Sequence, residues 1–348
     1  MKQGRGKSGS DGGLLGAMRI HAVALRSTLE MLNEPAPSAC ERVPWSDVKK
    51  GAEAVSKEAT TTGMLWSGTP SAQEAADKVE SYINTLQGFL LLCHGSTVGA
   101  GPTLLSTVQA VAKGALESSL SLLESALSLG SQAARLEALP PLTGCVWEAC
   151  ELVLKAPSDN RTAVGRAIVQ VGTSIKDVVR EMNEIELERA EGTIDDDDGD
   201  GGGRGSHCSS EVDPETLSFD AKFSPGEMDV ASAVKDVISA VLVVVRQLLY
   251  VVTKAQDTSA PGKLESLEKI LEQARSIGVD ADELGASVYP PQEIQEIRAR
   301  SRGIESSIQM VLAEVTALHG SVPDDLAVAC DKSQESHLGL HARLLALA

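Results

Sequence analysis

Three stretches of this sequence hold residue types at spacings that could do chemistry. The first is the glycine-rich segment 94–103, which resembles a loop that surrounds a phosphate with backbone N–H donors. It lacks the lysine of a P-loop, does not match GxGxxG and follows no predicted strand. Gly95 at a helix end and Pro102 at the next helix start explain the same composition, and we favour this structural interpretation.

The second stretch is the acidic run 196–201, which matches the DxDxDG opening of a calcium loop. Its twelfth position, where a bidentate glutamate belongs, is His207, and no amphipathic helix flanks the run. We interpret the match as a coincidence within a poly-aspartate tract, with weak and non-specific cation binding at most.

The third group is the histidines. His337 and His341 lie four residues apart, on one face of a predicted helix, a spacing that could hold a transition metal. A third ligand is missing, so solvated helix residues are the favoured interpretation. His94 and Ser96 are neighbours, but no GxSxG motif accompanies them. The sequence therefore predicts no catalytic residue, no cofactor-binding residue, no metal ligand and no cofactor.

Arg298, Arg300 and Arg302 form the one dense basic cluster of the sequence. Such a cluster could bind an acidic partner or the chain's own acidic tract, or serve as a weak nuclear signal. A solvated helix face is the favoured interpretation.

The overall composition excludes several function classes. The 348 residues include 31 Lys and Arg against 49 Asp and Glu, for a formal net charge of −18. This charge disfavours direct contact with nucleic acid or with an anionic membrane surface. Aromatic residues are only 3% of the chain, so platforms for stacking bases or sugars are scarce. The six cysteines show no CxxC pair, which is typical of a reducing compartment.

Helical periodicity is the dominant signal, because apolar residues recur at steps of three and four along almost the whole chain. The stripes that these apolar residues form are interrupted by prolines, at positions 35, 37, 70, 102, 140, 141, 157, 225, 290, 291 and 323. Capping boxes at Ser71–Glu74 and Ser224–Glu227 mark two helix starts. We expect a short helix to begin after Pro141. The longest apolar run, 237–252, is interrupted by Arg246 and is shorter than a membrane span of about 20 residues.

These stripes predict an all-α fold of two antiparallel helical bundles joined by an acidic disordered linker. Between Glu184 and Glu215, twelve acidic residues face two arginines, which argues against independent folding. The predicted organisation is a disordered N-terminus at 1–13, a first bundle at 14–190, the acidic Gly/Asp-rich linker at 191–223 and a second bundle at 224–348. The protein is expected to be soluble.

The seam from Ile297 to Leu318 has the most regular heptad spacing, with Ser301 at one core position. It could be an intermolecular zipper or one interior stripe of a bundle. Because nearly every other helix carries an equivalent stripe, we favour the interior stripe; oligomeric state stays open.

Several motifs resemble the cyclin-D-binding protein family, described as Id-like helix-loop-helix, leucine-zipper proteins. The segments that carry the resemblance are 63–68 (GMLWSG), 86–103 (LQGFLLLCHGSTVGAGPT), 146–150 (VWEAC), 282–286 (DELGA) and 289–294 (YPPQEI). The resemblance runs from about residue 15 to 330. It implies a non-enzymatic helical regulator of the cell cycle in nucleus and cytoplasm. The implied partners are D-type cyclins and helix-loop-helix transcription factors.

Charge makes the Id-like mode of action physically sensible. A helix-loop-helix dimer binds DNA through a basic region on each partner. No such basic region precedes a helix in this sequence. A helix-loop-helix factor that pairs with this chain is therefore expected to lose its ability to bind DNA. A gel-shift assay tests this expectation. Two alternatives stay open: a vinculin-like helical scaffold, tested by filament co-sedimentation, and an enzyme that uses the segment 94–103.

Thr193 and Ser210 fit acidophilic kinase sites, since an acidic residue follows each of them by three positions; an unmodified linker is equally consistent.

Overall fold

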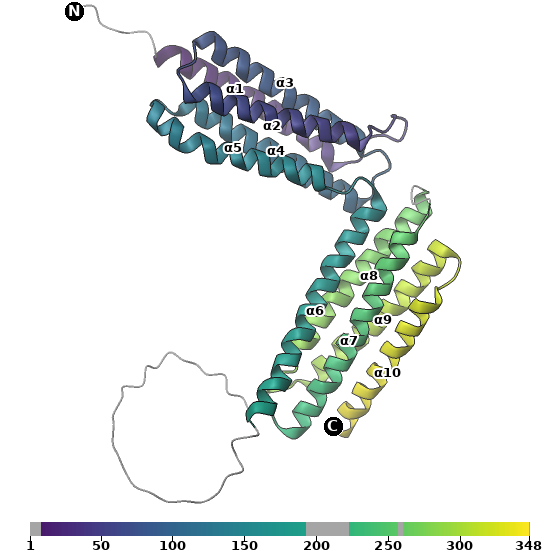
Figure 1. Cartoon of the computed structure of the whole chain (residues 1–348). Coiled ribbons are helices and arrows are strands. Elements are labelled where there is room, and N and C mark those ends of the chain that lie inside the picture. Colours follow the sequence, from purple (N-terminus) through teal and green to yellow (C-terminus); the bar gives the residue numbers. More distant parts are fainter. Residues whose placement is uncertain (1–7, 193–222, 257–259, 348) are drawn as a thin grey trace, which may run out of the picture. The chain divides into compact units, whose positions relative to one another are not determined.

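The computed structural model describes residues 8–192, 223–256 and 260–347. All regular elements within these ranges are helices, so the predicted all-α class is confirmed there (Figure 1). They are α1 Ser8–Glu30, the 3-10 turn η1 Met31–Asn33, α2 Trp45–Ser67, α3 Ala72–Ser96, α4 Pro102–Ser128, α5 Gln132–Lys155, α6 Asn160–Gly192, α7 Pro225–Lys254, α8 Pro261–Ala286, α9 Ile294–His319 and α10 Asp324–Ala346.

The first compact unit, Met1–Ala163, packs α1 to α5 side by side around one apolar core (Figure 1). The predicted stripes form this core, with Val55, Leu86, Leu116 and Val146 all inaccessible to solvent. The capping box at Ser71 is confirmed, because the Ser71 hydroxyl accepts from the Glu74 amide and the Glu74 carboxylate accepts from the Ser71 amide.

Helix α5 corrects the prediction of a short helix beginning after Pro141. It starts at Gln132, with Ser131 as its N-cap, and passes through Pro140 and Pro141 without ending. An interior proline leaves the carbonyl four residues earlier without its helical hydrogen bond. Here those carbonyls belong to Leu136 and Glu137, both exposed, so water can satisfy them.

The second compact unit, Val164–Ala348, contains α7 to α10 and nearly all of α6. Helix α7 is its centre, with fourteen buried residues, and it starts at the predicted capping box of Ser224 and Glu227. By length and composition alone α7 could cross a bilayer, but half of its most apolar window is buried within the unit. This burial is what the central helix of a helical bundle requires.

The predicted first bundle, 14–190, included the residues of α6, and the structure assigns most of this helix differently. From Val164 onward its apolar stripe joins the core of the second unit. Close contact with α8 explains the assignment. A Cβ at Gly285 would overlap Cγ1 of Val178, so glycine is needed for this approach, and the Ser174 hydroxyl donates to the Asp282 carboxylate at 3.0 Å. Periodicity predicted that α6 is buried but not which helices bury it.

Two further expectations concern the ends of the bundles. Helix α1 begins at Ser8, so residues 8–13 are helical and not part of a disordered terminus. The predicted linker, 191–223, lies outside the described residues except at its two edges.

The seam of α9 is an interior stripe, as favoured from the sequence. All seven of its core positions are buried: Ile297, Ser301, Ile304, Ile308, Val311, Val315 and Leu318. They pack in the second unit with α8 and α10, which leaves no face of this stripe for an intermolecular zipper.

Candidate protein-docking surface

An apolar groove lies between α2 and α5 in the first unit. We call it the α2–α5 groove, and its volume is about 370 Å³. Its lining residues are Thr60, Gly63, Met64, Ser67, Arg135, Leu136, Leu139, Pro140, Thr143 and Trp147. Met64, Leu136 and Trp147 are 70%, 53% and 46% exposed, so three large apolar side chains meet water in one place. Contiguous exposed apolar surface of this kind is typical of a binding site.

Hydrogen bonds hold side chains in place at both ends of the groove. Trp147 Nε1–H donates to Thr60 Oγ1 at 3.0 Å, which fixes the indole ring against α2. At the opposite end the Gln132 side chain donates to the Ser67 carbonyl at 2.9 Å, and Arg135 Nε–H donates to the Leu129 carbonyl at 2.7 Å. Trp147 and Arg135 are therefore held in place before any partner arrives, which lowers the entropy cost of binding at these two side chains.

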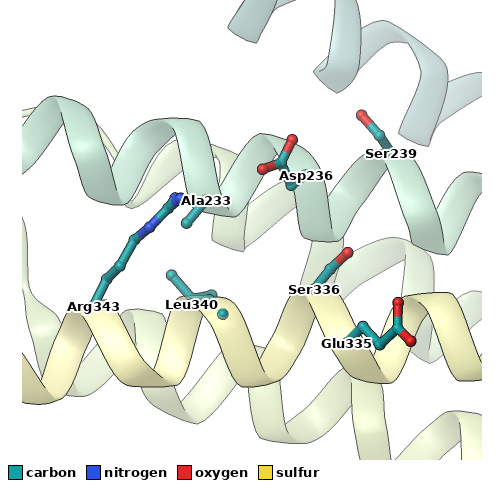
Figure 2. Close-up of a pocket in the computed structure, with 8 residues that line it drawn as sticks. Ala233, Asp236, Ser239, Glu335, Ser336, Leu340 and Arg343 are labelled. Carbon is teal, nitrogen blue, oxygen red and sulfur yellow. The ribbon is translucent and has the colours of Figure 1, made fainter.

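A second concavity, of about 390 Å³, lies between α7 and α10 in the second unit. Ala233, Gly339 and Leu340 line it together with polar side chains, and Arg343 extends from α10 toward Ala233 (Figure 2). The Arg343 guanidinium donates to the Asp229 carbonyl at 3.1 Å. Its lining is mixed in charge and offers little exposed apolar area, so it is the weaker candidate for docking a protein.

The histidine pair on α10 is engaged inside the protein. The Ser301 hydroxyl of α9 lies 2.7 Å from His337 Nδ1 and 3.2 Å from His341 Nε2. His337 is 1% exposed, and burial followed by the nearby His341 lowers its pKa to about 4. The interpretation as solvated helix residues is therefore wrong for His337, which is a buried neutral imidazole. Within the described residues no group of three or more metal-ligating side chains occurs.

The segment 94–103 fastens three loops together. Thr97 Oγ1 accepts from the Ala36 amide at 2.9 Å, and the Asn160 side chain accepts from the Gly101 amide at 2.8 Å and donates to the Gly99 carbonyl at 2.9 Å. A Cβ at Gly95 would lie 2.5 Å from Val43 Cγ2, so glycine is required by packing. Three amides of the segment are already used, since Thr97 donates to the His94 carbonyl, Ala100 to the Thr97 carbonyl and Gly101 to Asn160, which supports the structural interpretation.

The remaining candidate groups have different surroundings. The Ser96 hydroxyl donates to the Cys93 carbonyl, which gives it a structural role at the end of α3. Arg300 of the basic cluster pairs with Glu296 at 2.6 Å, Glu283 at 2.5 Å and Asp280 at 3.4 Å, whereas Arg302 is exposed. The acidic run 196–201, Thr193 and Ser210 lie outside the described residues.

Comparison with known proteins now decides the family. Residues 47–188 match the family model described as Grap2 and cyclin-D-interacting, N-terminal, and residues 194–313 match its C-terminal counterpart. The two modules occur in order and together cover most of the chain. The chain belongs to the Grap2 and cyclin-D-interacting family.

Three relatives have names that agree with this family. The chain is 22% identical over 278 residues to the cyclin-D1-binding protein 1 homolog of Xenopus laevis, covering 79% of this chain and 80% of the relative. It is 26% identical over 252 residues to the homolog of Danio rerio, covering 71% and 70%. It is 21% identical over 283 residues to cyclin-D1-binding protein 1 of Homo sapiens, covering 79% and 76%.

Three of the five motifs that carried the resemblance to this family lie at two places in the structure. Segments 63–68 and 146–150 border the α2–α5 groove, with Met64 and Trp147 as their exposed apolar members. Segment 282–286 instead positions α6, through Asp282 and Gly285. The groove residues were not predicted as a site. The available signal was that Met64 falls off the buried stripe of Ala59, Thr62 and Trp66.

Proposed function

We propose that this chain binds a D-type cyclin and acts through that contact, without catalysis of its own. The observation that carries the proposal is the match of both halves of the chain, in order, to the cyclin-D-interacting family. The names of the relatives in frog, fish and human state cyclin D1 binding for those proteins.

The geometry of the described residues supports an interaction protein. The groups that could do chemistry are engaged internally, since the segment 94–103 fastens loops and His337 bonds to Ser301. The α2–α5 groove is an apolar surface that faces water. Exposed, pre-formed apolar surface favours association with another protein.

A binding measurement with purified proteins tests the proposal. The full chain is titrated with a D-type cyclin by isothermal calorimetry, and with an A-type cyclin as the control. We expect a saturable complex with the D-type cyclin and at least tenfold weaker binding to the control. Equal binding to both cyclins, or binding to neither, would contradict the proposal.

The remaining expectations from the resemblance stay predictions. They are sequestration of helix-loop-helix factors in an Id-like manner, residence in nucleus and cytoplasm, and the absence of enzymatic activity. The vinculin-like scaffold is the alternative function, and co-sedimentation of the chain with filaments in place of cyclin binding would favour it.

A further inference from the structure

The α2–α5 groove contains the residue types that dominate the centres of protein interfaces. Tryptophan, methionine and arginine are enriched there relative to other surface positions, and Trp147, Met64 and Arg135 all line this groove. Leu139 and Thr143, at 2% and 6% exposure, form its floor. A side chain that enters the groove would therefore meet a fixed apolar base with an aromatic wall.

The dimensions of the groove fit one amphipathic helix. Its lining on α2 runs from Thr60 to Ser67, two helical turns that rise about 10 Å. A helix seated over two turns presents apolar residues at i, i+4 and i+7, which is the usual pattern for helix-in-groove recognition. An extended strand would need an open sheet edge, and the described part of the first unit is helical throughout.

Charge indicates which helix fits. Arg135 lies at the Ser67 end of the groove, and Lys57 is exposed three residues before Thr60, at the Trp147 end. Glu151, one turn beyond Trp147 on α5, is also exposed, so the Trp147 end carries charges of both signs and the Ser67 end is the cationic one. Arg135 is the only charged residue of the groove lining. Glu137 and Glu148 are exposed on α5, but each is rotated by about 100° from the groove-lining residue before it.

We propose that the α2–α5 groove binds an amphipathic helix of the protein partner, with apolar residues at i, i+4 and i+7 and a carboxylate that pairs with Arg135. The proposal rests on the proposed function for the identity of that partner, the D-type cyclin. It assigns the contact surface to Met64, Leu136 and Trp147, with Arg135 as the cationic end.

Charged substitutions at exposed groove positions provide the first test. Met64→Glu and Leu136→Glu in the full chain are expected to weaken cyclin binding at least tenfold. Leu152→Glu is the matched control, because Leu152 is also on α5 and 59% exposed but does not line the groove. We expect this control to bind within twofold of wild type. Unchanged circular dichroism and an unchanged urea midpoint verify that each variant is folded.

A synthetic helical peptide provides a second test that does not depend on the cyclin. It carries leucine at i and i+7, a photoreactive leucine at i+4, and flanking glutamates; a lysine-flanked version is the control. Irradiation of the glutamate peptide with the full chain is expected to cross-link the segments around Met64, Leu136 and Trp147, as mapped by mass spectrometry. The lysine peptide is expected to label them at least fivefold less.

The outcomes separate the two proposals. Wild-type cyclin binding that the groove variants leave unchanged, with peptide labelling elsewhere, overturns the groove assignment and keeps the function. Peptide labelling of the groove without cyclin binding overturns the function and keeps the groove as a helix-docking surface. A wild-type dimer that Met64→Glu dissociates identifies a second copy as the occupant and overturns the proposal, as does the failure of both assays.

Discussion

His337 is a titratable side chain in the core of the second unit, hydrogen-bonded to Ser301 of α9. Burial, followed by the proximity of His341, lowers its pKa to about 4. In the unfolded chain a histidine titrates near pH 6.5. Between these two values the unfolded state binds more protons than the folded state, so stability is full above about pH 6.5 and is lost as the pH falls toward 4.

We therefore expect acid to destabilise the second unit through His337, by about 2 kcal/mol at pH 5 relative to pH 7.5. Urea unfolding by circular dichroism at the two pH values measures this loss. In His337→Gln the loss should shrink by that amount, whereas exposed His21→Gln should behave as wild type. Trp45, Trp66 and Trp147 all lie in the first unit, so tryptophan emission should not show the His337 effect. Equal pH dependence of wild type and His337→Gln would contradict the assignment.

At the scale of the element, the packing of α6 on α8 depends on the small size of Gly285. A methyl group there would overlap Val178, and overpacking of a core contact typically costs about 1–3 kcal/mol. Gly285→Ala is expected to lower the free energy of unfolding of the second unit by that amount, measured by urea denaturation.

Gly339→Ala is the matched control for this substitution. Gly339 lies inside α10 in the same unit, and a Cβ there would have no atom within 4 Å. Because alanine is the better helix former, this variant is expected to gain up to about 1 kcal/mol. A gain in stability for both variants would show that helix propensity, and not the Val178 contact, decides the effect at Gly285.

The sequence predicted the helices well and their partners less well. Periodic stripes such as Ile297 to Leu318 identify buried positions because burial repeats with the helical turn. The stripe of α6 is equally clear, but a stripe does not specify which helices cover it. Pro140 and Pro141 predicted a helix start because interior prolines are costly, and the sequence did not reveal that the residues whose carbonyls lose a hydrogen bond, Leu136 and Glu137, are exposed.

The candidate site was the least predictable feature. The α2–α5 groove depends on Met64 and Trp147 lying off the buried stripes of two helices that are distant in sequence. Sequence shows that a residue is apolar, whereas its exposure depends on how α2 and α5 meet. Ser301 and His337 are a similar case, since their contact joins α9 to α10 across the core.

At the scale of the whole molecule, the family modules and the compact units divide the chain at different places. The N-terminal family model extends to residue 188, whereas the first compact unit ends at Ala163. A fragment 1–190 would therefore carry the apolar stripe of α6 without the helices that bury it. Exposed apolar stripes of this length promote association.

We expect fragment 1–163 to be a soluble monomer and fragment 1–190 to self-associate and bind the dye ANS. Light scattering during size-exclusion chromatography measures the first property and fluorescence the second. Adding Ile168→Ser and Ile175→Ser to fragment 1–190 should restore the monomer, since both side chains belong to the stripe. A monomeric, ANS-negative fragment 1–190 would show that the first unit accommodates α6 by itself.

Three buried cysteines, two in the first unit and one in the second, can report on the opening of each unit separately. Burial raises the pKa of Cys93 to about 12 and those of Cys150 and Cys330 to about 11, so at neutral pH their sulfurs are protonated and unreactive. Cys40 and Cys145 are exposed at the surface. A disulfide reagent should thus modify the surface thiols first. The slower labelling rate of Cys93 and Cys150 would measure how often the first unit opens transiently. The labelling rate of Cys330 would measure the same for the second unit.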